Sequence, residues 1–252
     1  MPQEKAEAHV LRRVDYSETS RIVTFLTPRR GRLACIAKGV RRKSSPLAGV
    51  LDTMNRVELV YYWKEGRSVQ TLADASLLEA YPGVKNDLER GAFAAFPLEL
   101  ALHVAHENEP SENFYAAFSA GLERLNDWRG DPRAHCAWQI ARMLAAAGFE
   151  PSLRECVHCG RAIGDNPGFD FEGGAVCGAC PAPRRVSRET LASLRALFAA
   201  AAECPDVPAP RDAFQLLRGY TARQTESDYR SLRVLDDLFP TADKESAGAP
   251  IR

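Results

Sequence analysis

Two Cys-x-x-Cys pairs constrain this chain more than any other feature. Cys156 and Cys159 form the first pair, Cys177 and Cys180 form the second, and 17 residues separate the pairs. This spacing is typical of a zinc site, and four thiolates fill a tetrahedral shell without leaving a position for water or substrate. The sequence therefore predicts one structural zinc ion in a module of about 25 residues, which folds around the metal because it is too small to bury a core of its own.

The residues between the pairs predict a hairpin that returns the second pair to the first. Residues 169–174 have the pattern of a strand followed by a Gly-Gly turn, and Gly160 and Gly178 supply the freedom needed by tight turns whose amides donate to sulfur. His158 is an alternative fourth ligand; iron or a disulfide pair are alternatives to zinc. The remaining thiols have no partner in the sequence, and we interpret them as buried: Cys35, Cys136 and Cys204.

The first 80 residues have the pattern of short strands. Five segments are rich in β-branched and aromatic residues and are separated by Gly, Pro and Ser. One connection, residues 39–56, is longer than the others. This arrangement predicts a small closed barrel of the oligonucleotide-binding (OB) type, because closure removes exposed strand edges. The five segments are residues 10–14, 21–26, 33–38, 57–63 and 69–75.

After Tyr81-Pro82-Gly83 the apolar residues recur with a helical period. Helices are expected at 88–105, bent or interrupted at Pro97, along the stripe Phe114 to Leu125, and from Asp131-Pro132 to Gly148. Three more are expected at 187–202, 211–223 and 229–239. The predicted fold is α+β and multidomain: an OB barrel (1–80), a helical domain (81–155 and 183–240) interrupted by the zinc module (156–182), and a disordered tail (241–252).

Charge is distributed unevenly, although 33 basic and 33 acidic residues cancel over the whole chain. Residues 1–45 contain eleven bases against four acids, a net charge of +7, whereas residues 81–150 contain six bases against ten acids, a net charge of −4. A cationic end joined to a neutral or acidic scaffold favours binding of a polyanion at the cationic end.

Two basic clusters are candidates for contacts with nucleic acid, since Arg and Lys neutralise phosphates and release counterions. The alternative is that these clusters are solvated turns. Strand aromatics can stack on unpaired bases or fill the barrel core; Tyr61 and Trp63 share one face and Tyr62 takes the other, so at least one side is expected to be core. The basic candidates are Arg29, Arg30, Arg32, Lys38, Arg41, Arg42 and Lys43, and the aromatic ones are Phe25, Tyr61, Tyr62 and Trp63.

Catalytic signatures are missing from the sequence. It has no Gly-rich phosphate loop and no His-x-Glu motif of a zinc deaminase. Glu99, His103 and His106 share one face of an expected helix, an arrangement more typical of solvated residues than of a metal site. The N-terminal residues are polar, and no stretch approaches about 18 apolar residues. We therefore expect a non-enzymatic, cytoplasmic protein without a small-molecule substrate or a membrane partner.

An ordered set of motifs resembles the bacterial recombination mediator family RecO. It consists of Val10-Leu11, Tyr16, Glu18, Ser20 and Ile22-Val23, then Gly31, then Ala37-Lys38-Gly39-x-Arg41-Arg42, and finally the two Cys pairs with Gly173-Gly174 between them. The resemblance covers nearly the whole chain.

The resemblance implies an N-terminal OB fold and a helical domain that carries the zinc module. It implies binding of single- and double-stranded DNA, annealing of complementary strands and, with the partner RecR, help to RecA in displacing single-stranded-DNA-binding protein at the nucleoid. Lys38, Arg41, Arg42 and neighbouring Lys43 match as DNA contacts, and the four cysteines match as ligands. Some members of the family lack the cysteines, so the metal is expected to support the fold. The alternative is a zinc-stabilised interaction scaffold whose basic barrel contacts an acidic protein.

Overall fold

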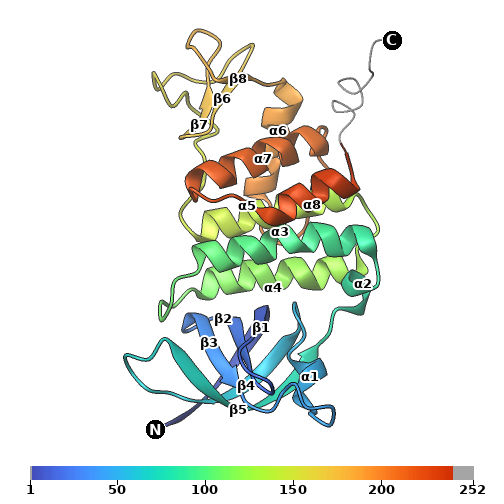
Figure 1. Ribbon diagram of the computed structural model, residues 1–252. Coiled ribbons are helices and arrows are strands. Elements are labelled where there is room, and N and C mark those ends of the chain that lie inside the picture. The colour runs from blue at the N-terminus through green and yellow to red at the C-terminus, as the bar shows by residue number, and fades with distance from the viewer. Residues whose placement is uncertain (1, 241–252) are drawn as a thin grey trace, which may run out of the picture. The chain divides into compact units, whose positions relative to one another are not determined.

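The computed structural model describes residues 2–240, and its first five strands close a barrel (Figure 1). The strands are β1 (Gln3–Asp15), β2 (Arg21–Thr27), β3 (Gly31–Ala37), β4 (Arg56–Tyr62) and β5 (Val69–Glu79), in the order β1-β2-β3-β5-β4. Neighbouring strands are antiparallel except β3 and β5, which are parallel. The predicted barrel of five strands is confirmed.

Strand β1 begins at Gln3, seven residues before the predicted start at Val10, so that boundary was wrong. Its first half pairs with β4 from Gln3 to His9, and its second half pairs with β2 from His9 to Asp15. The polar run from residue 3 to residue 7 lacks the β-branched side chains that signal a strand, and it is held by backbone pairing to β4. Strand β5 likewise continues past the predicted Ala75 to Glu79.

Alternate strand residues fill the barrel core, because successive side chains on a strand point to opposite faces. Val23, Phe25, Cys35 and Leu59 are fully buried in it. Burying one Val, Leu or Phe side chain contributes roughly 1.5–3 kcal/mol, so this interior stabilises the barrel despite its charged exterior. The longer connection after β3 includes the short helix α1 (Leu47–Val50).

The chain divides into two compact units. The first contains residues up to Asn86 together with Leu100–Trp128, and so includes the barrel, α2 (Pro82–Lys85) and α4 (Glu112–Asp127). As predicted, Phe114, Phe118, Leu122 and Leu125 form the buried stripe of α4.

The second unit contains Asp87–Glu99 and the residues from Arg129 onward. Its helices are α5 (Pro132–Ala146), α6 (Arg188–Ala199), α7 (Pro210–Gln224) and α8 (Arg230–Leu238). Helix α3 (Leu88–Val104) contributes residues to both units and runs through Pro97 as one helix. Two predicted helix starts are capped: Asp131 accepts a hydrogen bond from the Arg133 amide at 2.8 Å, and Ser187 accepts one from the Thr190 amide at 3.0 Å.

A small sheet in the second unit joins β6 (Gly168–Asp170), β7 (Gly174–Val176) and β8 (Arg184–Arg185) in the order β7-β6-β8 (Figure 1). Strands β6 and β7 form the hairpin predicted between the cysteine pairs. No helix within residues 2–240 combines the length and apolar character that crossing a bilayer demands. The expected disorder of residues 241–252 lies outside the described residues.

Candidate metal centre and nucleic-acid interface

The four cysteines of the two pairs converge on one point. The sulfur atoms of Cys156, Cys159, Cys177 and Cys180 all lie within 4.8 Å of one another, and those of Cys159 and Cys177 are 3.7 Å apart. A tetrahedral ion with Zn–S bonds of about 2.3 Å separates its sulfurs by about 3.8 Å, whereas a disulfide joins them at about 2.05 Å. The group can therefore hold one metal ion, and its spacing and soft donors fit zinc.

The thiol pKa values show why this cluster suits a cation. A backbone hydrogen bond from Cys177 lowers the pKa of the Cys156 thiol to about 6, and one from Ala179 lowers the pKa of Cys177. Hydrogen bonds with the thiols of Cys159 and Cys177 raise the pKa of Cys180 to about 12, because neighbouring sulfurs cannot all carry a negative charge unaided. A divalent ion removes that conflict and holds all four as thiolates.

Local backbone geometry brings each pair into its turn. Gly160 has φ +71°, a left-handed conformation that side chains disfavour, and its amide donates to the Cys156 carbonyl at 2.8 Å. A Cβ on Gly178 would lie 2.5 Å from the carbonyl oxygen of Asp165, so no larger residue fits there. The amide of Val157 donates to Ala175 at 3.0 Å, which ties the first turn to β7.

Arg185 is a positioning residue that the sequence pattern did not identify. Its guanidinium donates to the carbonyl oxygens of Asn166 at 3.1 Å, Cys177 at 3.3 Å and Cys180 at 2.9 Å. These contacts fix the backbone of the second pair from outside the metal shell. The sequence does not distinguish this Arg, five residues after the last Cys, from an ordinary basic residue on the surface.

Two other residues that the sequence offered as possible metal ligands, His158 and Glu99, have hydrogen-bond partners outside the four-cysteine cluster. Nε2 of His158 is 2.8 Å from Oδ2 of Asp170, and Glu99 accepts hydrogen bonds from Ser231. In the part of the chain that the structure describes, the four thiols are the one group of three or more potential ligands close enough to share an ion.

The three cysteines outside the cluster are covered by the fold, as predicted: Cys35 and Cys136 are buried and Cys204 is partly buried. Burial raises the pKa of the Cys35 thiol to about 12.

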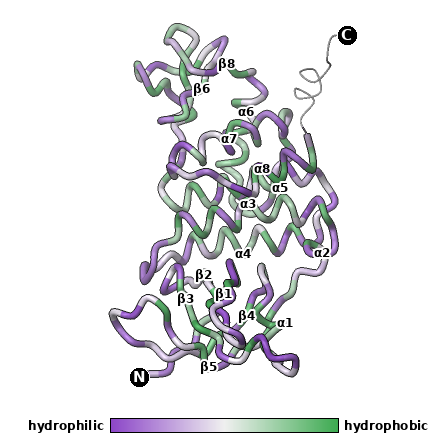
Figure 2. Tube along the Cα trace, in the orientation of Figure 1, coloured by the Kyte–Doolittle hydropathy of each residue, from purple (hydrophilic) through white to green (hydrophobic). Residues whose placement is uncertain are grey.

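The basic loop, residues 38–43, follows β3, and the tube between β3 and α1 includes hydrophilic stretches in Figure 2. Lys38, Arg41, Arg42 and Lys43 are all exposed, whereas Val40 between them is buried in the barrel core. Val40 thus anchors the loop to the barrel and leaves its cations at the surface.

Arg41 docks this loop on the β1–β2 turn, residues 16–20. Its backbone amide donates to the Thr19 carbonyl at 3.1 Å, and its guanidinium donates to the Ser17 carbonyl at 2.7 Å. The same guanidinium pairs with Asp15 at 3.3 Å, and Arg21 pairs with the other oxygen of that carboxylate at 2.7 Å. The Arg21 hydrogen bond holds the pKa of Asp15 below its usual range, so this carboxylate stays charged and paired.

The second predicted cluster lies at the other end of the β2–β3 hairpin. The register pairs Arg21 with Ala37 at one end and Thr27 with Gly31 at the other, about 20 Å away along six residues. Arg30 pairs with Glu4 at 2.7 Å and lies 3.9 Å above the Trp63 ring, while Arg32 donates to the Leu102 carbonyl. Arg29 alone of these three is exposed. The structure therefore does not bring the two basic clusters into one patch.

Ion pairs separate the eleven N-terminal bases into two groups. Six of them pair with carboxylates: Lys5, Arg13, Arg21, Arg30, Arg32 and Arg41. The other five form no ion pair within residues 2–240: Arg12, Arg29, Lys38, Arg42 and Lys43. The last three of these are on the basic loop.

The four strand aromatics are mostly interior. Phe25 and Tyr61 are buried, and the Tyr61 hydroxyl donates to Glu4 at 2.8 Å. Trp63 is half-buried against the barrel core under Arg30. Tyr62 is the exposed member of the four. The interpretation that one side of this set fills the core agrees with these positions.

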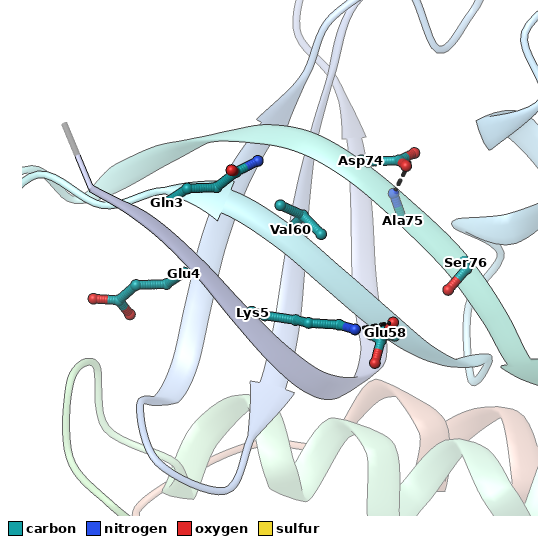
Figure 3. Close-up of a pocket in the computed structure, with 8 residues that line it drawn as sticks. All are labelled: Gln3, Glu4, Lys5, Glu58, Val60, Asp74, Ala75 and Ser76. Carbon is teal, nitrogen blue, oxygen red and sulfur yellow. Dashed lines mark hydrogen bonds and ion pairs between the residues drawn. The ribbon is translucent and has the colours of Figure 1, made fainter.

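A hollow on the outer side of the barrel is acidic. Figure 3 shows it across β1, β4 and β5, with Lys5 reaching Glu58 at 2.8 Å. Its volume is about 410 Å³, and the carboxylates of Glu58 and Asp74 line it with the one amine of Lys5, whereas the Glu4 side chain points away from them in Figure 3 and pairs with Arg30. Two carboxylates against one amine give this surface a net negative charge, so the basic loop and the β1–β2 turn form the better interface for a polyanion.

Comparisons with known proteins cover almost the whole chain. The family model described as Recombination protein O N terminal matches residues 1–81, and the model described as Recombination protein O C terminal matches residues 85–233. A DNA repair protein RecO from Anaeromyxobacter dehalogenans strain 2CP-C is 31% identical over 251 residues, covering 95% of this chain and 98% of the relative.

Relatives from two further organisms are similar to this chain over most of its length. The DNA repair protein RecO of a Nocardioides strain is 33% identical over 240 residues, covering 91% of this chain and 98% of its own. That of Bifidobacterium adolescentis is 33% identical over 248 residues, covering 94% of this chain and 100% of its own. Matches of this extent in both halves, on a closed barrel followed by helices and a four-cysteine cluster, show that the chain belongs to the RecO family of DNA repair proteins.

Proposed function

We propose that this protein is a non-enzymatic DNA repair and recombination mediator that binds single- and double-stranded DNA and anneals complementary strands. The observation that carries the proposal is the basic loop: Lys38, Arg42 and Lys43 are exposed and have no carboxylate partner among residues 2–240. Unpaired cations beside one another on an anchored loop bind the phosphate backbone through counterion release, without regard to base sequence. Contacts of this kind tolerate any pair of complementary strands, as annealing requires.

Family membership supports the wider role. By analogy with the family, the protein acts in the bacterial cytoplasm and joins the nucleoid during repair. It works with RecR to load RecA on DNA coated by single-stranded-DNA-binding protein. The four cysteines hold one structural zinc ion, since a closed shell of four thiolates offers no open position for chemistry.

The salt dependence of DNA binding tests the proposal. Fluorescence anisotropy with a labelled single strand should give a linear fall of log affinity with log salt concentration. Replacing Arg42 and Lys43 by Ala removes two phosphate contacts. It should weaken binding about 10- to 30-fold near 0.1 M salt and make the slope shallower by about 1.4.

The matched control replaces Lys64 and Arg67, which are exposed on the β4–β5 connection, by Ala. This variant loses the same charge from the same barrel and should keep both affinity and slope. Equal losses in the two variants would mean that net charge, and not the basic loop, governs binding. If the parent protein does not bind DNA but binds an acidic protein through the basic loop, the alternative of a zinc-stabilised interaction scaffold is supported instead.

Annealing is measured separately with two complementary strands, one of them labelled. The parent should accelerate duplex formation, and the Arg42/Lys43 variant should lose most of that acceleration. DNA binding without any acceleration would remove annealing from the proposal and leave binding in place.

A further inference from the structure

One exposed aromatic side chain lies beside the basic loop. Among residues 2–240 two aromatic side chains are exposed, Tyr16 with 64% of its surface accessible and Tyr62 with 40%. Tyr16 belongs to the β1–β2 turn on which Arg41 docks the basic loop, whereas Tyr62 is the last residue of β4 and pairs with Gln3, at the opposite end of β1. Because most of the Tyr16 side chain lies in water, it buries little apolar surface in the fold, and packing does not explain its position.

The backbone around Tyr16 is fixed on both sides. The Tyr16 amide donates to the Ser20 carbonyl at 3.1 Å, and the Ser17 hydroxyl accepts from the Ser20 amide at 3.3 Å. Arg41 then binds the residues on either side of Tyr16, through the Asp15 carboxylate and the Ser17 carbonyl. An aromatic ring held on an ordered turn loses little further freedom when a ligand binds it.

The electrostatics at this turn suit a nucleic acid strand. Two acids are close to Tyr16 in sequence: the Asp15 carboxylate is already paired with Arg21 and Arg41, and Glu18 is exposed on the same turn, where the three cations of the basic loop outnumber it. The cations of Lys38, Arg42 and Lys43 lie on the loop that Arg41 holds against the turn. An aromatic face beside a track of cations is the arrangement by which proteins bind unpaired bases, because every base offers a π face for stacking.

We propose that Tyr16 stacks on an unpaired base while the basic loop holds the adjacent phosphates, so that this turn favours single-stranded over duplex DNA. The inference rests on the proposed DNA-binding function and adds a selectivity to it. Bases inside a duplex are already stacked on their neighbours, and Tyr16 can gain contact with them only after unpairing. Arg41 is the positioning residue, since it sets the turn and the loop against each other.

The test compares single-stranded and duplex oligonucleotides of the same length with the full chain. Tyr16→Ala should weaken single-strand binding roughly 5- to 150-fold, the range that stacking of one base spans. It should leave duplex binding within about twofold and the salt slope unchanged, because no phosphate contact is lost. Tyr16→Phe keeps the aromatic face and should bind single strands as the parent does.

Leu77→Ala is the control, an exposed apolar side chain on β5 of the same barrel and outside the basic loop and the β1–β2 turn, and should change neither affinity. A strand with 2-aminopurine at successive positions gives a direct signal, because stacking on Tyr16 quenches its fluorescence and Tyr16→Ala restores it. Thermal unfolding checks that each variant folds like the parent.

Three outcomes overturn the inference. If Tyr16→Ala binds single strands as the parent does, while the Arg42/Lys43 variant still binds weakly, then Tyr16 does not stack on DNA and the proposed DNA-binding function is unaffected. An equal loss on single strands and duplex shows that Tyr16 supports the turn and does not stack. A parent protein that binds neither DNA form overturns both the proposed function and this selectivity.

Discussion

At the scale of single residues, His9 shows how the first unit tolerates a polar group inside its core. His9 is fully buried on β1, with Nε2 3.1 Å from the Ser119 hydroxyl and its ring 5.1 Å from that of Phe118. Burial lowers its pKa to about 3, because the imidazolium would lose its hydration, and the positive charge of Arg56 acts in the same direction. The folded protein therefore keeps His9 neutral.

This neutral histidine predicts acid sensitivity. The folded pKa is depressed below the unfolded value of about 6.5, so the unfolded chain binds an extra proton between pH 6.5 and about 3. The contribution of His9 to stability is complete above pH 6.5. It falls by about 1.4 kcal/mol for each pH unit below that, or about 2 kcal/mol at pH 5.

Urea unfolding at pH 7.5 and pH 5.0 measures this effect. His9→Gln removes the titrating group and should make the loss of stability between the two pH values smaller by about 2 kcal/mol, although the variant starts from a lower stability. His106→Gln replaces an exposed histidine and should keep the full loss. If His9→Gln and the parent lose equal stability on acidification, the protonation of His9 is not coupled to unfolding.

At the scale of elements, the metal module is a hairpin clamped between two turns. Its three strands contain two or three residues each, too few to be stable without a further constraint. Metal binding at a four-thiolate site supplies about 10–16 kcal/mol in small zinc modules, which is enough to order the segment.

We predict that Cys159→Ser abolishes binding of the one zinc ion and unfolds the module locally. Elemental analysis should find one zinc per chain in the parent and far less than one in the variant. Hydrogen exchange should become fast at the Val157 amide, which donates to Ala175 in the folded hairpin. Cys204→Ser, a change outside the cluster, should keep its zinc and its protection. Full zinc occupancy in Cys159→Ser would argue against a four-cysteine shell.

The sequence predicted elements well where local chemistry determines them. Asp131-Pro132 and the stripe Phe114 to Leu125 identified α5 and α4, because caps and periodic apolar residues act within one helix. The start of β1 was missed because the polar residues from Gln3 onward are held by β4, a partner about 50 residues away. The metal site was predicted from spacing alone, since both pairs are local turns joined by one hairpin.

The interface was less predictable than the metal site. Sequence reveals that Arg30, Arg32 and Lys38 are charged, and it does not reveal that the first two are paired with carboxylates and the third is not. Arg41 was assigned to DNA, yet its guanidinium also joins two loops. Which carboxylate or carbonyl each Arg contacts depends on strand register and barrel closure, and these are properties of the whole unit.

At the scale of the whole molecule, the candidate interface and the metal centre belong to different compact units. The basic loop and the β1–β2 turn are in the first unit, and all four cysteines are in the second. The barrel has its own buried core, which contains no residue of the metal module. A fold of this kind permits the barrel to bind DNA whether or not the second unit holds its metal.

This division predicts that loss of zinc leaves DNA binding by the barrel intact. Cys159→Ser, compared with the parent by anisotropy across a salt series, should keep its single-strand affinity within about twofold and its salt slope unchanged, because no cation of the basic loop is altered. The Arg42/Lys43 variant provides the opposite pattern, full zinc with weakened DNA binding. A shallower slope in Cys159→Ser would mean that DNA phosphates also contact basic side chains of the second unit, such as Arg161 and Arg184 beside the cysteine pairs. The DNA-binding surface would then extend beyond the barrel.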